Sequence, residues 1–308
     1  MRAWQLVVAV LLATGQVAWP WGIQTYSERI GPCWVLQVHD GDSISVRLPQ
    51  GEVIAVRYLG IDAPDEGPIS QLAWDRNREL VEGKEVELVV ATLGGTYLTD
   101  RDGRWLACVF TPGWPTEPVQ VLLLREGLAR LDLWEVRDDF RLWHEQMFLR
   151  GQLVAARERL GLWKLPDFCG NQDFIIAAIK FWGDTEEVYL LNRGEAALEL
   201  AEAWALVDEG AQERWERGEN PRNSIAFEAA FGPTCSLLPG GVLVIRTGPG
   251  VPPGDRRTPP QGCGTQQVVL NWFGNQIWNN DGDIAYLYAP GPTLVCTYRY
   301  PWRTRSEN

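Results

Sequence analysis

Histidine is almost absent from this chain, and the signatures of several common catalytic sites are missing. The 308 residues include only two histidines, His39 and His144, which excludes a site built on a cluster of histidine ligands. No Cys-x-x-Cys pair occurs among the six cysteines, so a cysteine-type zinc site is not expected. The chain also lacks a P-loop motif and the Gly-x-Ser-x-Gly turn of serine hydrolases.

Positive charge is also scarce. The chain carries 28 Lys and Arg against 40 Asp and Glu, a formal net charge of -12. Lysine occurs only at positions 84, 164 and 180, and the acidic excess extends over both halves of the sequence. Neither half is therefore a basic nucleic-acid module by its overall charge. Any binding of phosphate must come from a local group of residues, which we expect to include a metal ion.

Long apolar runs are missing beyond the N-terminus, so no membrane span is expected in the mature chain. Residues 1–22 have the pattern of a signal peptide. Arg2 is followed by the apolar run Leu6 to Ala13, and Ala13-Thr14-Gly15 supplies small residues for cleavage. The alternative is an N-terminal anchor helix. We expect export, with the protein secreted, periplasmic or held at the cell envelope.

Export would permit disulfide bonds between the cysteines. Cys235 and Cys263 flank a loop rich in glycine and proline and are the first candidates for a bridge. Cys108 lies in the apolar strand pattern Trp-Leu-Ala-Cys-Val-Phe and is expected to be a small buried residue.

The residue pattern of the chain changes near Leu165-Pro166-Asp167. Before this point, alternating strand patterns precede two helical patterns, which predicts a small barrel with attached helices. After it, short strands separated by Gly, Asn and Pro turns predict a β-sandwich. We therefore expect a mainly β protein with an α+β first domain. The predicted boundaries are a signal peptide at 1–22, a first domain at 23–165, a linker at 166–171 and a second domain at 172–302.

Strands are expected at 34–46, 53–59, 85–91 and 104–110, and helices at 119–127 and 138–160. In the second domain, strands are expected at 174–181, 188–191, 197–207, 241–247, 267–272 and 284–288, with an exposed loop at 248–264.

Three separate segments of the first domain carry acidic residues and arginines. They are His39-Asp40-Gly41-Asp42-Ser43, the strand end that runs from Arg57 to Asp65, and Thr99 to Ala107, which contains Arg104. Each segment taken alone is typical of a turn, a solvated strand end or a hairpin.

Taken together, the three segments offer a coherent site for phosphate chemistry. Asp42 and Asp62 can share one hard cation with a backbone carbonyl and water, a set of oxygen ligands that suits Ca²⁺. Arg57 and Arg104 offer planar donor groups that match phosphate oxygens and would stabilise charge on a pentacoordinate phosphorus. A nearby carboxylate could take a proton from the attacking water.

In this order, the segments resemble the staphylococcal nuclease (thermonuclease) family. The resemblance continues through Arg125 to Arg130 and ends at Ala155 to Trp163, so that it covers residues 34–164. It implies an OB-fold barrel and Ca²⁺-dependent hydrolysis of the P–O5′ bond of DNA or RNA, leaving 3′-phosphates.

The resemblance also implies a role for each residue that matches the family's motif. The calcium carboxylates fall on Asp42 and Asp62, the carbonyl ligand on Ala63, and an acid near the metal on Asp40. The phosphate-binding arginines fall on Arg57 and Arg104, and the general base falls on Asp65.

Three departures from the family pattern affect these expectations. Asp65 replaces a glutamate and is one methylene shorter, and Ala63 replaces a threonine. Tyrosines of the family that contact the nucleotide are replaced by Asp102, Leu133 and Glu135, with Trp134 as an alternative stacking residue. The two histidines are expected to lie at the surface or near the site rather than to act as catalysts.

The second domain resembles the lamin-tail family, an immunoglobulin-like sandwich, over about residues 172–300. The resemblance rests on Glu186 to Gly194, Leu238 to Ile245 and Ile277 to Leu287. It implies a module that binds nucleic acid, protein or an envelope ligand. Asp281-Gly282-Asp283 is more typical of a turn than of a calcium site, and Trp272, Trp278 and Tyr286 more typical of a core than of a stacking surface.

The sequence thus predicts an exported Ca²⁺-dependent nuclease that cuts single-stranded or frayed DNA or RNA. The alternative is a weak or inactive nucleic-acid or envelope-binding protein built on the same two domains. A structural envelope protein with a vestigial barrel is a third possibility, against which the intact Arg57, Asp62 and Arg104 argue. The oligomeric state is left open.

Overall fold

The structure is a computed structural model, and it describes residues 25–113, 115–132, 141–181, 183–219, 224–231, 234–251, 260–272, 275–279, 282–291 and 293–300. The predicted signal peptide, Leu133 to Glu135 and Asp281 lie outside the described residues, as do residues 252–259 of the predicted 248–264 loop. Within the described residues, no helix is long and apolar enough to cross a membrane.

The described residues form two compact units. The first contains residues 25–123 and 141–148, and the second contains residues 124–132 and 149–300. These two units are defined by which residues pack together, whereas the predicted boundaries at 165 and 172 are defined by a change in sequence composition. The domain boundaries therefore stay a prediction.

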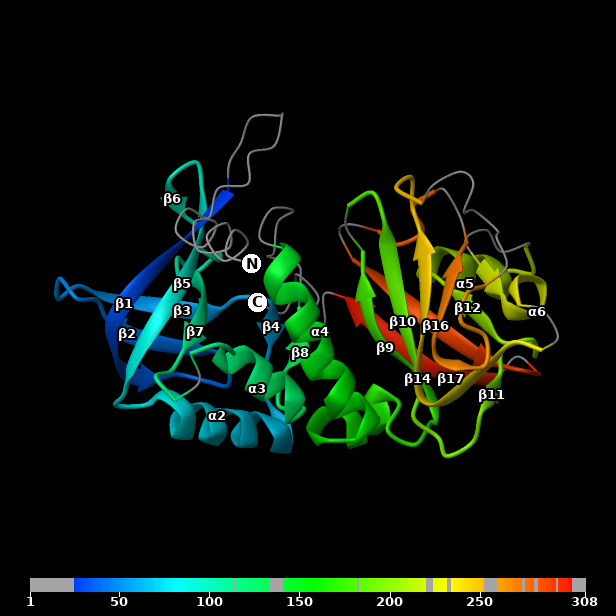
Figure 1. The fold of residues 1–308 in the computed structure, drawn as a ribbon, viewed down its shortest axis with the longest axis horizontal. Helices are drawn as coiled ribbons and strands as arrows, with labels where there is room; N and C mark the ends of the chain where they lie inside the picture. The colour runs from blue at the N-terminus through cyan, green and yellow to red at the C-terminus, as the bar shows by residue number, and fades with distance from the viewer. Residues whose placement is uncertain are drawn as a thin grey trace, which may run out of the picture. The chain divides into compact units, whose positions relative to one another are not determined.

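The first unit is a closed five-stranded barrel of the OB type (Figure 1), as the sequence predicts. The strands follow one another around the barrel in the order β1-β2-β3-β7-β5, and β5 pairs with β1 to close it. All neighbours are antiparallel except β3 and β7. The strands are β1 (Thr25–Val38), β2 (Ser43–Arg47), β3 (Val53–Tyr58), β5 (Glu85–Leu93) and β7 (Trp105–Phe110), with β4 (Ile61–Asp62) after β3 and β6 (Thr96–Tyr97) extending β5. The short strand β8 (Arg130–Leu131) belongs to the second unit.

The alternation of strand side chains places the core and the candidate site on opposite faces of β3. Val56 and Tyr58 are fully buried, whereas Arg57 between them lies at a partly exposed position. The barrel therefore presents Arg57 on the face away from Val56 and Tyr58.

Both helices that the sequence patterns predict are present, and a third helix, α2, was missed. The helices α3 (Val119–Arg125) and α4 (Arg141–Arg157) lie within the predicted ranges. The helix α2 (Gly67–Val81) was not predicted, because its buried positions are Ile69, Ala73, Asn77 and Val81. These positions are four residues apart, but a small and a polar residue dilute the apolar stripe.

The second unit contains two sheets. The first has the order β11-β14-β10-β9, with β15 parallel to β14, and the second has the order β13-β12-β16-β17. The strands of the first sheet are β9 (Phe174–Lys180), β10 (Glu186–Asn192), β11 (Leu198–Glu199), β14 (Ser236–Thr247) and β15 (Thr265–Asn271). Those of the second are β12 (Ala205–Val207), β13 (Ser224–Ala226), β16 (Asp283–Ala289) and β17 (Thr293–Tyr300). The predicted mainly β composition is confirmed.

Details of the second unit differ from the prediction. The expected strand at 197–207 is divided into β11 and β12, and β17 was missed. The helices α5 (Glu209–Glu216) and α6 (Phe227–Ala230) replace part of the expected strand-and-turn region. Asp208 begins α5 as its N-cap, since its carboxylate accepts a hydrogen bond from the Ala211 amide at 2.6 Å.

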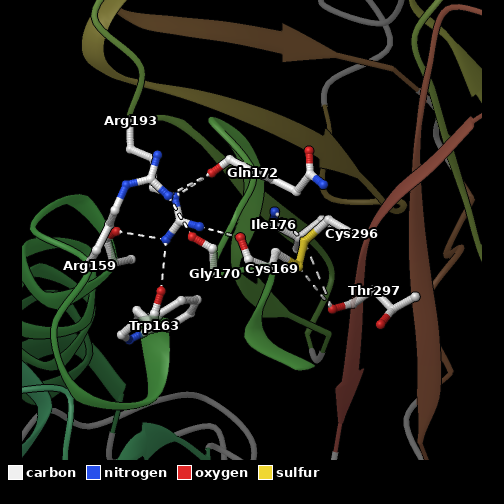
Figure 2. Close-up of a disulfide and its surroundings, with 10 residues drawn as sticks. Arg159, Trp163, Cys169, Gly170, Gln172, Ile176, Arg193, Cys296 and Thr297 are labelled. Carbon is white, nitrogen blue, oxygen red and sulfur yellow. Dashed lines mark hydrogen bonds between the residues drawn. A yellow bond between two sulfur atoms is a disulfide. The ribbon is translucent and has the colours of Figure 1, made fainter. Parts of the chain in front are cut away.

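Two disulfides stabilise the second unit. The Cys235–Cys263 bridge confirms the sequence prediction, and a second bridge joins Cys169 to Cys296 (Figure 2). Cys33 and Cys108 are reduced and buried, which confirms the expectation for Cys108.

A buried arginine holds the chain around the Cys169–Cys296 bridge. Arg193 is 8% exposed and donates to the carbonyl oxygens of Gln172, Ala156, Trp163 and Cys169. Burial lowers the pKa of its guanidinium to about 10. The predicted linker thus contains the short helix η2 (Pro166–Phe168), which follows η1 (Gly161–Lys164), and a disulfide cysteine.

We expect the Cys169–Cys296 bridge to stabilise the fold more than the Cys235–Cys263 bridge. The two bridges span 127 and 28 residues, and loop-closure entropy then favours the longer loop by about 1 kcal/mol. The test compares the urea unfolding of two double variants, Cys169→Ser with Cys296→Ser and Cys235→Ser with Cys263→Ser. A larger loss of unfolding free energy in the second variant would contradict this ranking.

Candidate active site

The turn between β1 and β2 carries two of the predicted acidic residues in a fixed conformation. The Asp40 carboxylate accepts hydrogen bonds from the Asp42 amide at 2.9 Å and from the Ser43 hydroxyl at 2.7 Å. The Asp42 carbonyl in turn accepts from the Tyr58 amide at 2.8 Å. Side-chain bonds from aspartate to its own following backbone are typical of such turns. The Asp42 side chain therefore projects from a backbone fixed to both its own turn and β3.

Gly41 allows this turn to lie against its neighbours. A Cβ at this position would lie 2.6 Å from the Ala63 Cβ and 2.8 Å from the Ala73 Cβ. The turn thus packs against the residue after β4 and against α2. No larger residue fits this position without a backbone shift.

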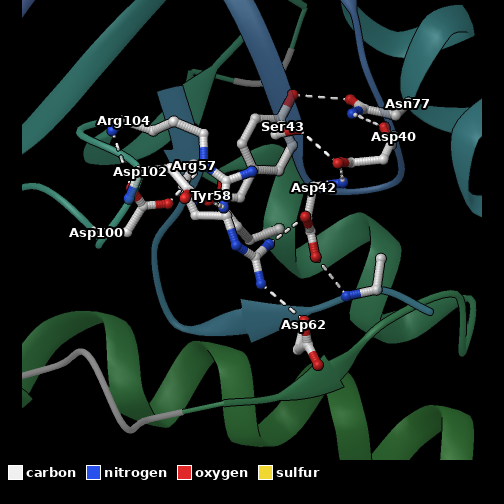
Figure 3. A network of polar contacts seen from close by, with 12 residues as sticks. Asp40, Asp42, Ser43, Arg57, Tyr58, Asp62, Asn77, Asp100, Asp102 and Arg104 are labelled. Carbon is white, nitrogen blue, oxygen red and sulfur yellow. Dashed lines mark hydrogen bonds and ion pairs between the residues drawn. The ribbon is translucent and has the colours of Figure 1, made fainter. Parts of the chain in front are cut away.

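The Arg57 guanidinium lies between Asp42 and Asp62 (Figure 3). It forms an ion pair with the Asp42 carboxylate, and its second terminal nitrogen lies 2.8 Å from Asp62 Oδ1. The exposed fractions of the three side chains are 12% for Arg57, 6% for Asp42 and 8% for Asp62. The Ala63 amide donates to the other Asp42 oxygen. Four predicted site residues therefore meet in one nearly buried cluster.

When Asp42 and Asp62 are both ionised, their two negative charges exceed the single positive charge of Arg57. The pKa of Asp42 is raised to about 8, chiefly by burial and also by the charges of Asp40 and Asp62, while Arg57 opposes the shift. Burial also raises the pKa of Asp40, but hydrogen bonds from Ser43 and Asp42, with the charge of Arg57, outweigh it and leave that pKa below its usual value. Crowded carboxylates of this kind favour a bound cation.

The donor chemistry fits a hard cation, with help from the backbone. Among the described residues, no group of three or more His, Cys, Asp or Glu side chains is arranged to hold a metal ion. A cation at Asp42 and Asp62 would need further oxygen ligands, and the Ala63 carbonyl and water can supply them. Carboxylate, carbonyl and water oxygens suit Ca²⁺ and do not suit the softer transition metals.

Arg104 immediately precedes β7 and is held by its own acidic partners. In β7, Trp105 is the register partner of Val56 and Leu106 that of Arg57, so the backbone of Arg104 lies next to the β3 segment that carries Arg57. The Arg104 Nε donates to Asp100 at 2.6 Å, and a terminal nitrogen lies 3.3 Å from Asp102. Asp100 and Asp102 thus orient the Arg104 guanidinium, whereas Asp42 and Asp62 hold that of Arg57.

Asp65, the predicted general base, lies in the loop between β4 and α2. It is exposed and follows Asp62 by three residues. His39 donates or accepts one bond with the Ser45 hydroxyl at 2.7 Å at an exposed position, apart from the carboxylate cluster. Asp65 is therefore exposed to solvent, and the side-chain hydrogen bond of His39 goes to Ser45.

Two residues that the sequence reasoning missed support the site from behind. Tyr58 and Asn77 are fully buried, and the Tyr58 hydroxyl donates to Asn77 Oδ1 at 2.7 Å. The Asn77 amide nitrogen donates to the Asp40 carbonyl at 3.0 Å. The only signal in the sequence was the position of Asn77, four residues after Ala73 and four before Val81. This spacing indicates a shared helix face only when the helix has already been assigned.

Comparison with known families agrees with this arrangement. Residues 55–165 match the model of the family described as Staphylococcal nuclease homologue. This region contains Arg57, Asp62, Asp65 and Arg104, and it supports a nuclease-type hydrolase in general. The turn with Asp42 precedes the matched region.

No curated protein matches the chain. The predicted likeness of the second unit to the lamin-tail family is not confirmed, and it stays a prediction.

Gly41→Ala should destabilise the protein by about 1–3 kcal/mol, because the added methyl group overlaps Ala63 and Ala73. The matched control is Gly113→Ala, where no atom lies within 4 Å of the added Cβ. Urea unfolding of both full-length variants measures the difference. Equal stability of the two variants would show that the turn does not require glycine.

Proposed function

We propose that this protein is an exported, Ca²⁺-dependent nuclease that hydrolyses phosphodiester bonds of single-stranded DNA or RNA. The observation that carries the proposal is the placement of Arg57 between Asp42 and Asp62, beside the Ala63 amide. The family match over residues 55–165 supports the same class of reaction.

In the proposed site, Asp42, Asp62 and the Ala63 carbonyl hold the ion. When bound, Ca²⁺ supplies positive charge to the scissile phosphate and lets a polyanion approach a chain of net charge -12. Arg57 and Arg104 donate N–H groups to the non-bridging phosphate oxygens. A guanidinium carries five N–H donors in a planar fork, a geometry that matches phosphate oxygens.

Asp65 is the proposed general base. Its carboxylate takes a proton from the water that attacks phosphorus, the P–O5′ bond breaks, O5′ takes up a proton from solvent water to leave as a hydroxyl, and the product keeps a 3′-phosphate. Its exposed position between β4 and α2 admits both water and substrate. Asp40 contributes by holding the Asp42 amide and hence the direction of the Asp42 carboxylate.

A binding protein without efficient catalysis is the second candidate. The observation that favours it is Asp65 itself, because a carboxylate one methylene shorter would sit about 1 Å from the productive position. A misplacement of that size can cost about 100-fold in rate. In this case the site keeps its affinity for Ca²⁺ and phosphate.

Export and the role of the second unit belong to the same proposal. The pattern of residues 1–22 supports export, and two disulfides fit an oxidising compartment. We propose a secreted, periplasmic or envelope location, with the second unit binding nucleic acid or an envelope ligand.

Cleavage should depend on both the ion and the arginines. Full-length protein without its signal peptide is incubated with denatured DNA, with Ca²⁺ or with a chelator. Arg57→Ala and Arg104→Ala should each lower the rate by about 100-fold or more, since each removes donors aimed at developing charge. Arg47→Ala, at the exposed end of β2, is the matched control and should keep the parent rate. Cleavage indifferent to the ion and to both arginines would refute the mechanism.

The Asp65→Glu variant distinguishes between the two candidate functions, an efficient nuclease and a binding protein. In an efficient enzyme that already uses Asp65, the longer side chain should change the rate by less than about 10-fold. A gain of about 100-fold from a nearly silent parent would instead identify the native chain as the binding protein. The measurement is the initial rate of cleavage at saturating Ca²⁺.

A further inference from the structure

The strongest group outside the proposed machinery is the buried pair formed by Asn77 and Tyr58. Both side chains are fully buried behind the carboxylate cluster, and neither belongs to the predicted site. We propose that Asn77 is a positioning residue that fixes the Asp40–Asp42 turn for cation binding, with Tyr58 as its partner. This inference rests on the proposed function, because it concerns the same ion.

Asn77 joins three elements through two hydrogen bonds. From α2, its side-chain nitrogen donates to the Asp40 carbonyl at 3.0 Å, at the end of β1. Its side-chain oxygen accepts from the Tyr58 hydroxyl at 2.7 Å, on β3. Figure 3 shows the amide facing both partners. The helix thereby sets the position of the turn relative to the strand.

The contacts continue from Asn77 to Asp42 without a gap. The Asp40 carboxylate holds the Asp42 amide at 2.9 Å, and the Tyr58 amide holds the Asp42 carbonyl at 2.8 Å. Both partners of Asn77 are therefore bonded to the backbone of Asp42. A shift of the Asp40 backbone would move the Asp42 carboxylate relative to Asp62.

The choice of asparagine is informative because packing alone would not require it. The other buried positions on this face of α2 hold Ile69, Ala73 and Val81, which are apolar. A buried amide is costly unless both its donor and its acceptor are satisfied, and here both are satisfied by groups next to the site. Groups that orient metal ligands from behind commonly change metal affinity by 10–100-fold when removed.

Gln120 provides a matched control within the same unit. It is also fully buried on a helix, α3, and its amide bonds two backbone groups of β7. Its nitrogen donates to the Ala107 carbonyl at 2.9 Å, and its oxygen accepts from the Val109 amide at 3.2 Å. Neither bond involves the Asp40–Asp42 turn. Replacing either amide by leucine removes two buried hydrogen bonds, but only Asn77 is bonded to the site.

The experiment measures Ca²⁺ binding to the full-length protein by calorimetry, alongside urea unfolding of each variant. Asn77→Leu should weaken Ca²⁺ binding by about 10–100-fold, whereas Gln120→Leu should weaken it by less than about 3-fold at a comparable loss of stability. Tyr58→Phe keeps the ring and removes only the hydroxyl, so it should weaken binding by a smaller factor. In an Asn77→Leu background, Tyr58→Phe should add no further loss.

Equal Ca²⁺ affinity in the Asn77→Leu and Gln120→Leu variants would overturn the positioning role while leaving the proposed function intact. If Asn77→Leu does not fold, Tyr58→Phe decides the question, and unchanged Ca²⁺ affinity in that variant overturns the proposal. A wild-type protein that binds no Ca²⁺ would refute the proposed function, and the positioning role with it.

Discussion

The central constraint in this structure is the cost of keeping two carboxylates charged in a nearly buried position. Asp42 and Asp62 share one guanidinium, that of Arg57, and Asp40 adds a third acid to the same place. With all three acids ionised, one positive charge cannot balance three negative ones, and removing any of them from water is expensive. That imbalance suits the divalent cation of the proposed function, without which a phosphate would meet net negative charge. In that proposal the acids are the ligands of the ion, and Arg57 is the group that keeps them close together.

That arrangement depends on a backbone that brings three strand ends and a helix to one point. The Asp40–Asp42 turn can approach Ala63 and Ala73 because Gly41 has no side chain. The same turn is bonded to β3 through the Tyr58 amide and to α2 through Asn77. The closed barrel brings the strand ends together, but these short-range contacts set the direction of the Asp42 carboxylate. The site is thus rigid where the carboxylates lie and open where Asp65 faces solvent.

The parts that the sequence predicted are those governed by local patterns. The alternation of apolar and polar residues predicted the barrel strands. The order of the motifs predicted that Arg57, Asp62 and Asp65 belong to one site. The Cys235–Cys263 bridge was accessible because both cysteines flank one loop. The Cys169–Cys296 bridge and the Asn77–Asp40 bond were not, since they join residues 127 and 37 positions apart. The helix α2 was missed because its buried stripe includes Ala73 and Asn77, which a periodicity argument counts as weak or polar.

The second unit contributes more than a separate module would. The family match extends to residue 165, yet residues 124–132 and 149–165 pack within the second unit. Arg193 on the second unit's β10–β11 connection satisfies the carbonyls of Ala156 and Trp163, and the Gln152 amide donates to the Ala177 carbonyl of β9 at 2.7 Å. Buried carbonyls that lose such donors are costly to leave unpaired. Residues 149–165, the last part of the segment that matches the nuclease family, therefore depend on β9 and the β10–β11 connection of the second unit for hydrogen-bond partners. These parts of the second unit belong to the fold of the nuclease-like segment, and are not an independent module.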